Sequence, residues 1–315
     1  MNHGRIMRTL VITFICLFFA FASRLIYAQG CSDAGFCTIG SLNPLREDSM
    51  KLGQKISFLF PLGIGDESVF VFTPAVQYDN QLSERWGIQA KVTANYADGN
   101  LGRAFGLGDI VLSGMYTIKG KGKWSTSITI GTKLLLNPGN LESEGRPLPM
   151  QYQSSLGTID LITGISFSDN SWQLSMGWQQ PVSGENRNNF LPAYWQDTPE
   201  AEKYPPSNDF NRKGDVLLRA AYTISLKRKF FLTPGLLAIY HLDEDTYVDP
   251  NVSNDPIAII GSQGLTLNMT LAGLWTVSDR LALGFSAGTP LIFRDVRPDG
   301  LTRKIVFAPE FRLKF

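Results

Sequence analysis

Large apolar residues recur at every second position along much of the chain after about Lys51. In the last segment these positions hold Ile305, Phe307, Pro309, Phe311, Leu313 and Phe315. The positions between them hold Lys304, Val306, Ala308, Glu310, Arg312 and Lys314. Successive side chains of a β-strand point to opposite faces, so the pattern predicts a strand with one apolar and one polar face. Segments 172–179 and 281–288 repeat it, with small residues and amides opposite the large apolar ones.

The connections between the expected strands alternate between short and long. Short polar turns are expected at 79–84, 120–123, 168–171, 227–229 and 278–280. Longer polar stretches are expected at 97–107, 137–150, 183–212, 243–260 and 294–302, after a short first connection at 63–68. This alternation is typical of outer-membrane barrels, which have short periplasmic turns and longer external loops. We therefore predict an all-β fold, an antiparallel transmembrane β-barrel of about 12 strands over residues 51–315.

Three tryptophans stand at matching positions in this pattern. Trp86, Trp124 and Trp172 each follow an expected short turn, on the apolar side of the strand. A soluble β-sandwich is the alternative, because its core would also bury one face of every strand. Three tryptophans at one level favour instead an aromatic girdle at a membrane interface.

The first 28 residues have the pattern of an export signal. Arg5 and Arg8 precede an uncharged run over 10–22 that is too short to span a bilayer comfortably, and Ala28 offers a small-residue cleavage site. An uncleaved anchor helix and a lipid attached to Cys31 are the alternatives. We expect residues 1–28 to be a cleaved signal peptide, and the mature protein to reside in the outer membrane of a Gram-negative bacterium.

Composition changes this picture little. The mean hydropathy is −0.03, because alternating strands average out in any window. Beyond the signal no apolar run is long enough for a transmembrane helix. The formal net charge of +1 falls to −2 once three arginines leave with the signal (1 − 3 = −2). The chain therefore lacks the basic surplus of a nucleic-acid-binding protein, and no nucleic acid is expected as a partner.

Residues 29–50 precede the first expected strand and contain two cysteines, Cys31 and Cys37. In an oxidising periplasm such a pair predicts a disulfide. A metal site is disfavoured because no second cluster of ligands lies nearby, and no cofactor is expected. We expect this segment either to enter the lumen as a plug or to dock beneath the barrel as a periplasmic tail. As a plug it would pack Leu42, Leu45 and Met50 inside, with Arg46, Glu47 and Asp48 near Arg312 and Lys314.

Charged residues also fall on the polar faces of the expected strands. By the alternation, the lumen-facing candidates are Lys55, Lys91, Asp109, Lys133, Asp160, Arg219, Glu310 and Arg312. One interpretation is an ionic network that fills a narrow barrel. The other is a charged constriction that selects solutes.

His241 is the one histidine outside the signal. A hydrolase at the barrel rim would need a histidine beside a nucleophile, and no supporting serine pattern accompanies this one. The acidic loop that follows could hold Ca²⁺ through Asp243, Asp245 and Asp249, or remain a solvated loop.

Two short segments resemble a known family. Gly106-Leu-Gly-Asp109 opens one expected strand, and Gly157-Thr-Ile-Asp160 opens another. Both resemble strands of the family named for the MetA pathway of phenol degradation, which is related in fold to long-chain fatty-acid and aromatic-hydrocarbon channels. The segment from Cys31 to Cys37 resembles Bacteroidetes-type barrels of this kind. The fatty-acid channels have more strands and a longer N-terminal hatch than this chain can supply.

The C-terminus is similar to that of outer-membrane barrels in general. The residues that carry this resemblance are Phe307, Phe311, Leu313 and Phe315. It implies recognition by the barrel-assembly machinery, alongside membrane lipid and a small solute as partners. We expect a channel or transporter for a small, apolar or amphipathic solute and no enzymatic activity. A non-transporting surface or adhesion barrel is the alternative, and a rim hydrolase ranks third.

Overall fold

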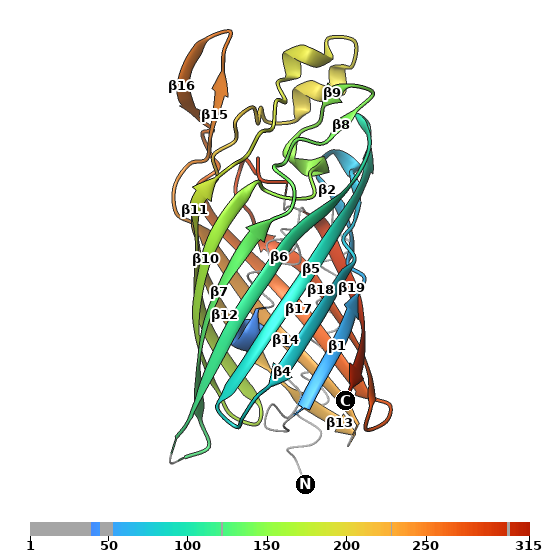
Figure 1. Ribbon diagram of the computed structural model, residues 1–315, viewed down its shortest axis with the longest axis vertical. Coiled ribbons are helices and arrows are strands. Elements are labelled where there is room, and N and C mark those ends of the chain that lie inside the picture. Colours follow the sequence, from blue (N-terminus) through green and yellow to red (C-terminus); the bar gives the residue numbers. More distant parts are fainter. Residues whose placement is uncertain (1–38, 45–52, 121, 228, 301–302) are drawn as a thin grey trace.

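The wall of the molecule is one antiparallel sheet that closes on itself (Figure 1). The computed structural model describes residues 39–44, 53–120, 122–227, 229–300 and 303–315. The strands of the wall are β1 (Gly53–Leu59), β2 (Leu62–Gly65), β3 (Phe70–Phe72), β4 (Ala75–Gln81), β5 (Trp86–Gly99), β6 (Gly102–Lys119), β7 (Ser125–Leu135), β10 (Thr158–Ser168), β11 (Trp172–Gly184), β12 (Asp215–Tyr222), β13 (Ile224–Lys227), β14 (Phe230–His241), β17 (Gly264–Thr276), β18 (Leu281–Ile292) and β19 (Arg303–Lys314). The signal, both cysteines and residues 45–50 of the expected plug lie outside the described ranges.

Fifteen segments make twelve wall strands, because three pairs are successive pieces of one strand (15 − 3 = 12). β1 continues into β2, β3 into β4, and β12 into β13. Pro61 and Pro74 lie at the first two breaks, where a proline removes a ladder donor. The barrel closes where β1 pairs with β19, with Phe58 opposite Phe311. The predicted all-β barrel of about twelve strands is confirmed.

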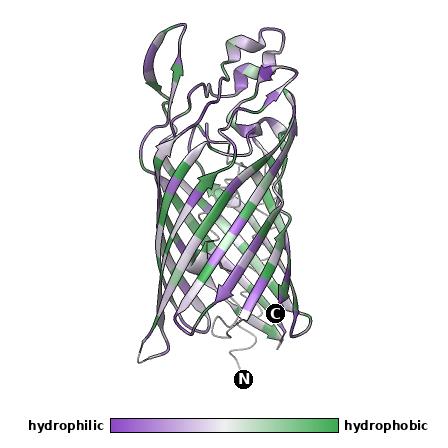
Figure 2. Ribbon diagram, in the orientation of Figure 1, coloured by the Kyte–Doolittle hydropathy of each residue, from purple (hydrophilic) through white to green (hydrophobic). Residues whose placement is uncertain are grey.

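The two faces of the wall differ in chemistry, and Figure 2 shows hydrophobic and hydrophilic residues following one another along the strands. On β11, Trp172, Leu174 and Met176 are exposed on the outside. The residues between them, including Gln173 and Ser175, are buried on the inside. Large exposed apolar side chains recur around the outside of the other strands, so this exterior suits lipid rather than water. Within the described ranges no helix is long and apolar enough to cross a membrane.

One predicted loop is wrong. Residues 97–107 were expected to form a long polar connection, but β5 runs to Gly99 and β6 begins at Gly102. The strands extend because Ala97, Leu101 and Ala104 are buried in an apolar cluster that stabilises them. Gly106 and Gly108 lie inside β6, where they allow another segment to approach closely.

The other long connections gather at the end opposite the short turns (Figure 1). They contain the 3-10 helices η4 (Met150–Tyr152), η5 (Pro192–Trp195) and η6 (Pro199–Lys203). They also contain two hairpins, β8 (Glu142–Ser143) with β9 (Arg146–Pro147), and β15 (Thr246–Asp249) with β16 (Ser253–Ala258). In outer-membrane barrels the long loops are external and the short turns periplasmic, so we call this end the external end and the other the periplasmic end.

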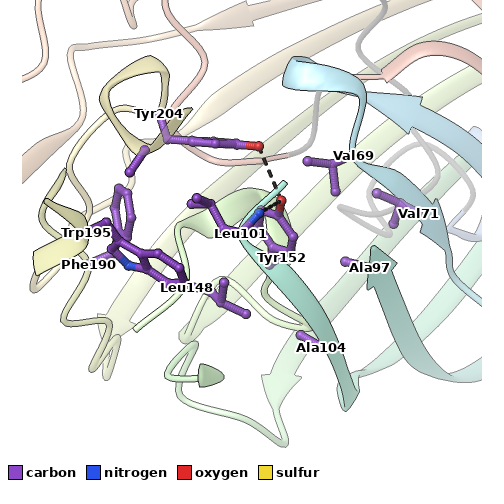
Figure 3. Close-up of a cluster of buried hydrophobic side chains, with 11 residues drawn as sticks. Val69, Val71, Ala97, Leu101, Ala104, Leu148, Tyr152, Phe190, Trp195 and Tyr204 are labelled. Carbon is purple, nitrogen blue, oxygen red and sulfur yellow. Dashed lines mark hydrogen bonds between the residues drawn. The ribbon is translucent and has the colours of Figure 1, made fainter. Parts of the chain in front are cut away.

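The external loops pack on one another through an apolar cluster (Figure 3). Leu148, Tyr152, Phe190, Trp195 and Tyr204 meet there. The Tyr152 hydroxyl accepts a hydrogen bond from the backbone N–H of residue 101 at 3.1 Å and lies 3.3 Å from the Tyr204 hydroxyl. Burial raises the pKa of the Tyr204 hydroxyl well above its usual range. The loops therefore form an ordered cap, which their polar composition alone did not indicate.

Candidate functional site: the lumen and its two closures

The interior wall of the barrel consists mainly of hydroxyl, amide and charged side chains. Buried inward residues of this kind include Ser57, Gln77, Gln89, Thr93, Asn95, Thr117, Ser127, Thr129, Ser166, Gln173, Ser175, Gln179, Thr266 and Asn268. They alternate with lipid-facing residues along the same strands. A wall of this composition can hydrate a passing solute, as porin-type lumens do.

The structure brings three of the predicted lumen residues together. The Lys133 ammonium lies 3.0 Å from a carboxylate oxygen of Asp160 and 3.8 Å from one of Asp109. The Ser155 hydroxyl donates to the Asp109 carboxylate at 2.6 Å, and Gln179 donates to Asp160. These groups join β6, β7, β10 and β11, so the cluster fixes neighbouring strands and one external loop.

The other predicted residues lie apart from that cluster. Glu310 and Arg312 form a buried pair along β19, and the Arg312 Nη2 donates to Glu310 at 2.9 Å. Lys55 lies 3.8 Å from the carboxylate of Asp79. Lys91 is buried in β5. Arg219 contacts a segment that comes from outside the wall.

That segment is residues 39–44, which we call the lower plug. It includes the 3-10 helix η2 (Gly40–Leu42) and lies within the barrel towards the periplasmic end (Figure 1). Ile39 and Leu42 are fully buried against inward apolar residues of the wall. We call these wall residues the lumenal apolar patch: Val111, Ile162, Leu217, Leu237 and the half-buried Ile239. Of the residues expected to plug the lumen, Leu42 falls in the described ranges and lies inside.

Hydrogen bonds hold the backbone of the lower plug. The backbone N–H of Gly40 donates to the Gln89 side chain at 3.0 Å, and the Ser41 hydroxyl lies 2.8 Å from that of Thr129. The carbonyl oxygens face three donors: Ser166 and Gln173 donate to residue 41, both at 2.8 Å, and Arg219 donates to residue 42. The lower plug therefore satisfies its buried polar groups on the lumen wall.

The external half of the lumen is filled by loops. Residues 150–156 lie over β5 and β6, where Ser154 donates to the carbonyl oxygen of residue 107 at 2.7 Å. An added Cβ at Gly106 or Gly108 would come within 2.6 Å or 2.3 Å of Ser154 or Thr93, so these glycines permit the close approach. A cavity remains between loop and wall, and the polar side chains that line it are Thr73, Thr93, Asn95, Asp109, Gln151, Gln153, Ser154, Ser155 and Asp299. Its room for a water-sized sphere is about 30 Å³, which suits a few waters and not a larger solute.

Six ionisable side chains lie at the external end of the lumen, and we call them the upper ionic cluster. They are Arg212, Asp215, His241, Asp245, Arg294 and Asp299, and all are buried. His241 lies 2.7 Å from Asp215 through Nδ1 and 2.9 Å from Asp245 through Nε2. Arg294 donates to Asp299 at 2.8 Å, and Arg212 pairs with Asp215 and, at 3.6 Å, with Asp299. The cluster links three external loops to β12 and β14.

Four members of the cluster lie in loops outside the strands, and the titration of two of them, Arg212 and Asp299, shows how the charges balance. Burial opposes the charge of Arg212, but Asp215 and Asp299 outweigh it and raise the pKa of the guanidinium. Burial would raise the pKa of Asp299, but Arg294 and Arg212 lower it below its usual value. Both groups are therefore held in their charged forms.

The surroundings of His241 bear on the third-ranked function. Both ring nitrogens contact carboxylate oxygens, so this histidine bridges two acids instead of facing a nucleophile. Asp245 turns inward to it while Asp243 is exposed, so these two candidate Ca²⁺ ligands do not share one site. In the part of the chain that the structure describes, no group of three or more His, Cys, Asp or Glu side chains is arranged to hold a metal ion.

Sequence reasoning missed most of the upper ionic cluster. Arg212, Arg294 and Asp299 fell in stretches taken as solvated loops. Their position next to strand ends could have predicted that two of them face the lumen. Arg212 precedes β12 by three residues, and Arg294 follows β18 by two. It also missed Ile39, which packs beside Leu42.

The predicted membrane-boundary residues lie on the exterior. Trp86, Trp124 and Trp172 are exposed near the short turns, and so is Trp275 at the same end. Tyr116 packs at a tilt against Trp86 and Tyr222 packs edge-on against Trp172, with ring centroids 4.7 Å and 4.9 Å apart. At the C-terminus Phe307, Phe311 and Phe315 are exposed and Leu313 is half-buried.

Comparison with known proteins shows the fold and no family. No family model and no curated protein matches the sequence. An outer membrane channel from Pseudomonas putida F1 is similar in structure, with a TM-score of 0.58 at 10% identity over 84% of this chain and 96% of that one. The KdgM porin in complex with oligogalacturonate (TM-score 0.44, 6% identity, 83% and 99%) and the toluene transporter TbuX of Ralstonia pickettii (0.42, 9%, 88% and 94%) score too low to support an argument. The resemblance to the phenol-degradation family stays a prediction.

Proposed function

We propose that this protein is an outer-membrane channel for a small amphipathic solute. The observation that carries the proposal is the way the lumen is filled. The wall of the lumen is polar. The lumen is occupied by the lower plug at one end and by the external loops at the other. A barrel built only as a scaffold could fill its interior with wall side chains, as the smallest barrels do.

The composition of the lumen favours an amphipathic solute over a wholly apolar one. An apolar molecule would displace water from amides, hydroxyls and charges along most of the wall, which is unfavourable. The lumenal apolar patch offers one local exception, at Val111, Ile162 and Leu217. A molecule with a polar end and a small apolar end would suit both surfaces.

Conductance tests the proposal. Full-length protein in planar bilayers should conduct in brief openings, and the double variant Ile39→Ser/Leu42→Ser should stay open longer because its lower plug loses its apolar contacts. Leu174→Ala, on the lipid face, is the matched control and should conduct as the parent does. The proposal fails if neither the parent nor the double variant conducts, and neither admits amphipathic solutes in liposome swelling. The surface-barrel alternative would then remain, with the β15–β16 hairpin as its exposed element.

Export and assembly belong to the same proposal. We infer cleavage after residue 28 and insertion by the barrel-assembly machinery through the C-terminal strand. The protein should fractionate with the outer membrane and migrate differently on a gel before and after boiling, since closed barrels resist detergent. Recovery as a soluble periplasmic species of unchanged mobility would contradict this.

A charge placed on the lipid face tests which side faces the membrane. Phe311→Asp should lower assembly, because a charge on the lipid face is destabilising, by about 2–4 kcal/mol for Arg or Lys at mid-membrane and by less for Asp or nearer the interface. Lys314→Asp, at the end of the same strand, should assemble nearly as well as the parent. The yield of heat-modifiable protein measures both, and equal yields would overturn the facing assignment.

A further inference from the structure

The lower plug occupies a shaped recess of the lumen wall. The lumenal apolar patch is contributed by β6, β10, β12 and β14, with polar residues on either side along the same strands. Val111, Ile162, Leu217 and Leu237 converge on Ile39 and Leu42. An apolar surface of this kind in a wet lumen gains free energy when an apolar group covers it.

Two glycines deepen the recess. A Cβ at Gly131 would come within 2.7 Å of Ile39 Cδ1, and one at Gly164 within 3.0 Å of Leu42 Cδ2. Each glycine therefore leaves a depression in which one branched side chain sits. The recess accepts two small branched or ring-shaped apolar groups.

Hydrogen-bond donors stand next to the recess. Ser166 Oγ and Gln173 Nε2 each donate to the carbonyl oxygen of Ser41 at 2.8 Å, and Gln173 also donates to that of Asn43 at 3.2 Å. Arg219 donates to the carbonyl oxygen of Leu42. Three donors, one of them a guanidinium, thus face oxygen atoms beside an apolar pocket.

We propose that the recess and its donors form a binding site for a small carboxylate with a branched aliphatic or aromatic tail, which the lower plug occupies in this structure. The tail would replace Leu42 and the carboxylate would replace the backbone oxygens. A carboxylate suits the donors better than a neutral carbonyl, because guanidinium–carboxylate hydrogen bonds are the stronger kind. The inference deepens the proposed channel function and rests on it for its purpose, whereas its test does not depend on conductance.

Calorimetry on full-length protein in detergent tests the site, with 4-methylpentanoate as the probe and 4-methylpentanamide as its uncharged counterpart. The Ile39→Ser/Leu42→Ser variant should bind the carboxylate about tenfold or more tighter than the parent, since the probe no longer competes with the lower plug. In that background Arg219→Gln should weaken carboxylate binding by about tenfold or more and leave amide binding unchanged. Arg219→Lys should bind the carboxylate more tightly than Arg219→Gln, because it keeps the positive charge. A merely structural role of Arg219 would not predict this difference.

A second experiment fills the recess with a side chain. Gly164→Leu should abolish binding in the open background, whereas Gly114→Leu should not, because the space at Gly114 is open. Heat-modifiable migration checks that every variant folds. Equal binding of carboxylate and amide, or no saturable binding in the double variant, overturns the site even if the channel conducts. Saturable carboxylate binding in a barrel that never conducts would support the site and overturn the channel.

Discussion

The two closures of the lumen use different physics. The lower plug is held by two apolar side chains and by hydrogen bonds to its backbone, with Arg219 as the charged contact. The upper ionic cluster is held by two arginines, three carboxylates and the histidine that bridges two of them, and all six side chains are buried. Apolar contacts can be released piecemeal, whereas a buried charge cannot lose its partner without a large penalty. Displacing the lower plug should therefore cost less than separating the charges of the upper ionic cluster, so we expect the lumen to open more readily at the periplasmic end.

The largest effect should come from removing one charge of the upper ionic cluster. Asp299→Asn leaves Arg294 and Arg212 short of a buried partner, which should favour opening of the external loops by about 3–5 kcal/mol. Protease sensitivity of residues 293–300 measures it. Asp279→Asn, in an exposed turn, is the control, and equal sensitivity of the two variants would show that the cluster does not hold the loops.

Low pH should destabilise the upper ionic cluster and leave the lower plug in place. The pKa of the Asp299 carboxyl is lower in the folded protein than in the unfolded chain. The carboxylate therefore contributes its full stabilisation at pH values above the ordinary Asp pKa. That stabilisation is lost as the pH falls through the lowered pKa of the folded state. Its buried neighbours are Arg212, Arg294, Asp215, Asp245 and His241. Hydrogen exchange, corrected for the intrinsic rate, should rise in residues 293–300 below about pH 4 while residues 40–42 change little. An equal rise in hydrogen exchange in residues 293–300 and 40–42 would show that the two closures do not differ in their response to pH.

Loss of apolar contact should weaken the lower plug by an intermediate amount. Leu42→Ala removes most of a fully buried side chain, and such changes typically cost about 2–5 kcal/mol. The lower part of that range is expected, since water can enter the vacated recess. The fraction of time that the channel is open reports the change, and the external loops should keep their protease resistance.

The smallest effect should come from a single neutral hydrogen bond. Ser166→Ala removes one of the donors to the carbonyl oxygen of Ser41, while Gln173 still donates to it. About 1 kcal/mol of plug stability is expected to be lost. An effect as large as that of Leu42→Ala would mean that hydrogen bonding, and not apolar contact, holds the lower plug.

Sequence alternation predicted the wall because lipid and lumen impose opposite chemistry on neighbouring residues. The same reasoning placed Lys133, Asp160 and Glu310 on strand faces that prove to be buried. It could not reveal their partners, since the charged groups that meet come from strands and loops far apart in the chain. It read residues 97–107 as a loop because small and polar residues on strands look like those of turns.

The loops were the least predictable part. Asp245 and Asp299 lie 54 residues apart (299 − 245 = 54) yet belong to one buried cluster, and no local pattern marks them. The contact of Arg219 was hidden for another reason. Its partner is a backbone oxygen, which every residue has, so only the path of the chain identifies it.

The lower plug is joined to the wall by a short stretch of chain, and this makes it an intramolecular ligand. Eight residues, 45–52, separate it from the first residue of β1 at the periplasmic end (52 − 44 = 8). A linker of this length holds its ligand at an effective concentration on the order of millimolar. Modest contacts then suffice for occupancy, and a competing solute must approach that concentration, or bind far more tightly, before it displaces the plug. On the proposed channel function, the barrel would thus behave as a threshold valve, closed to dilute solute and open once supply is high.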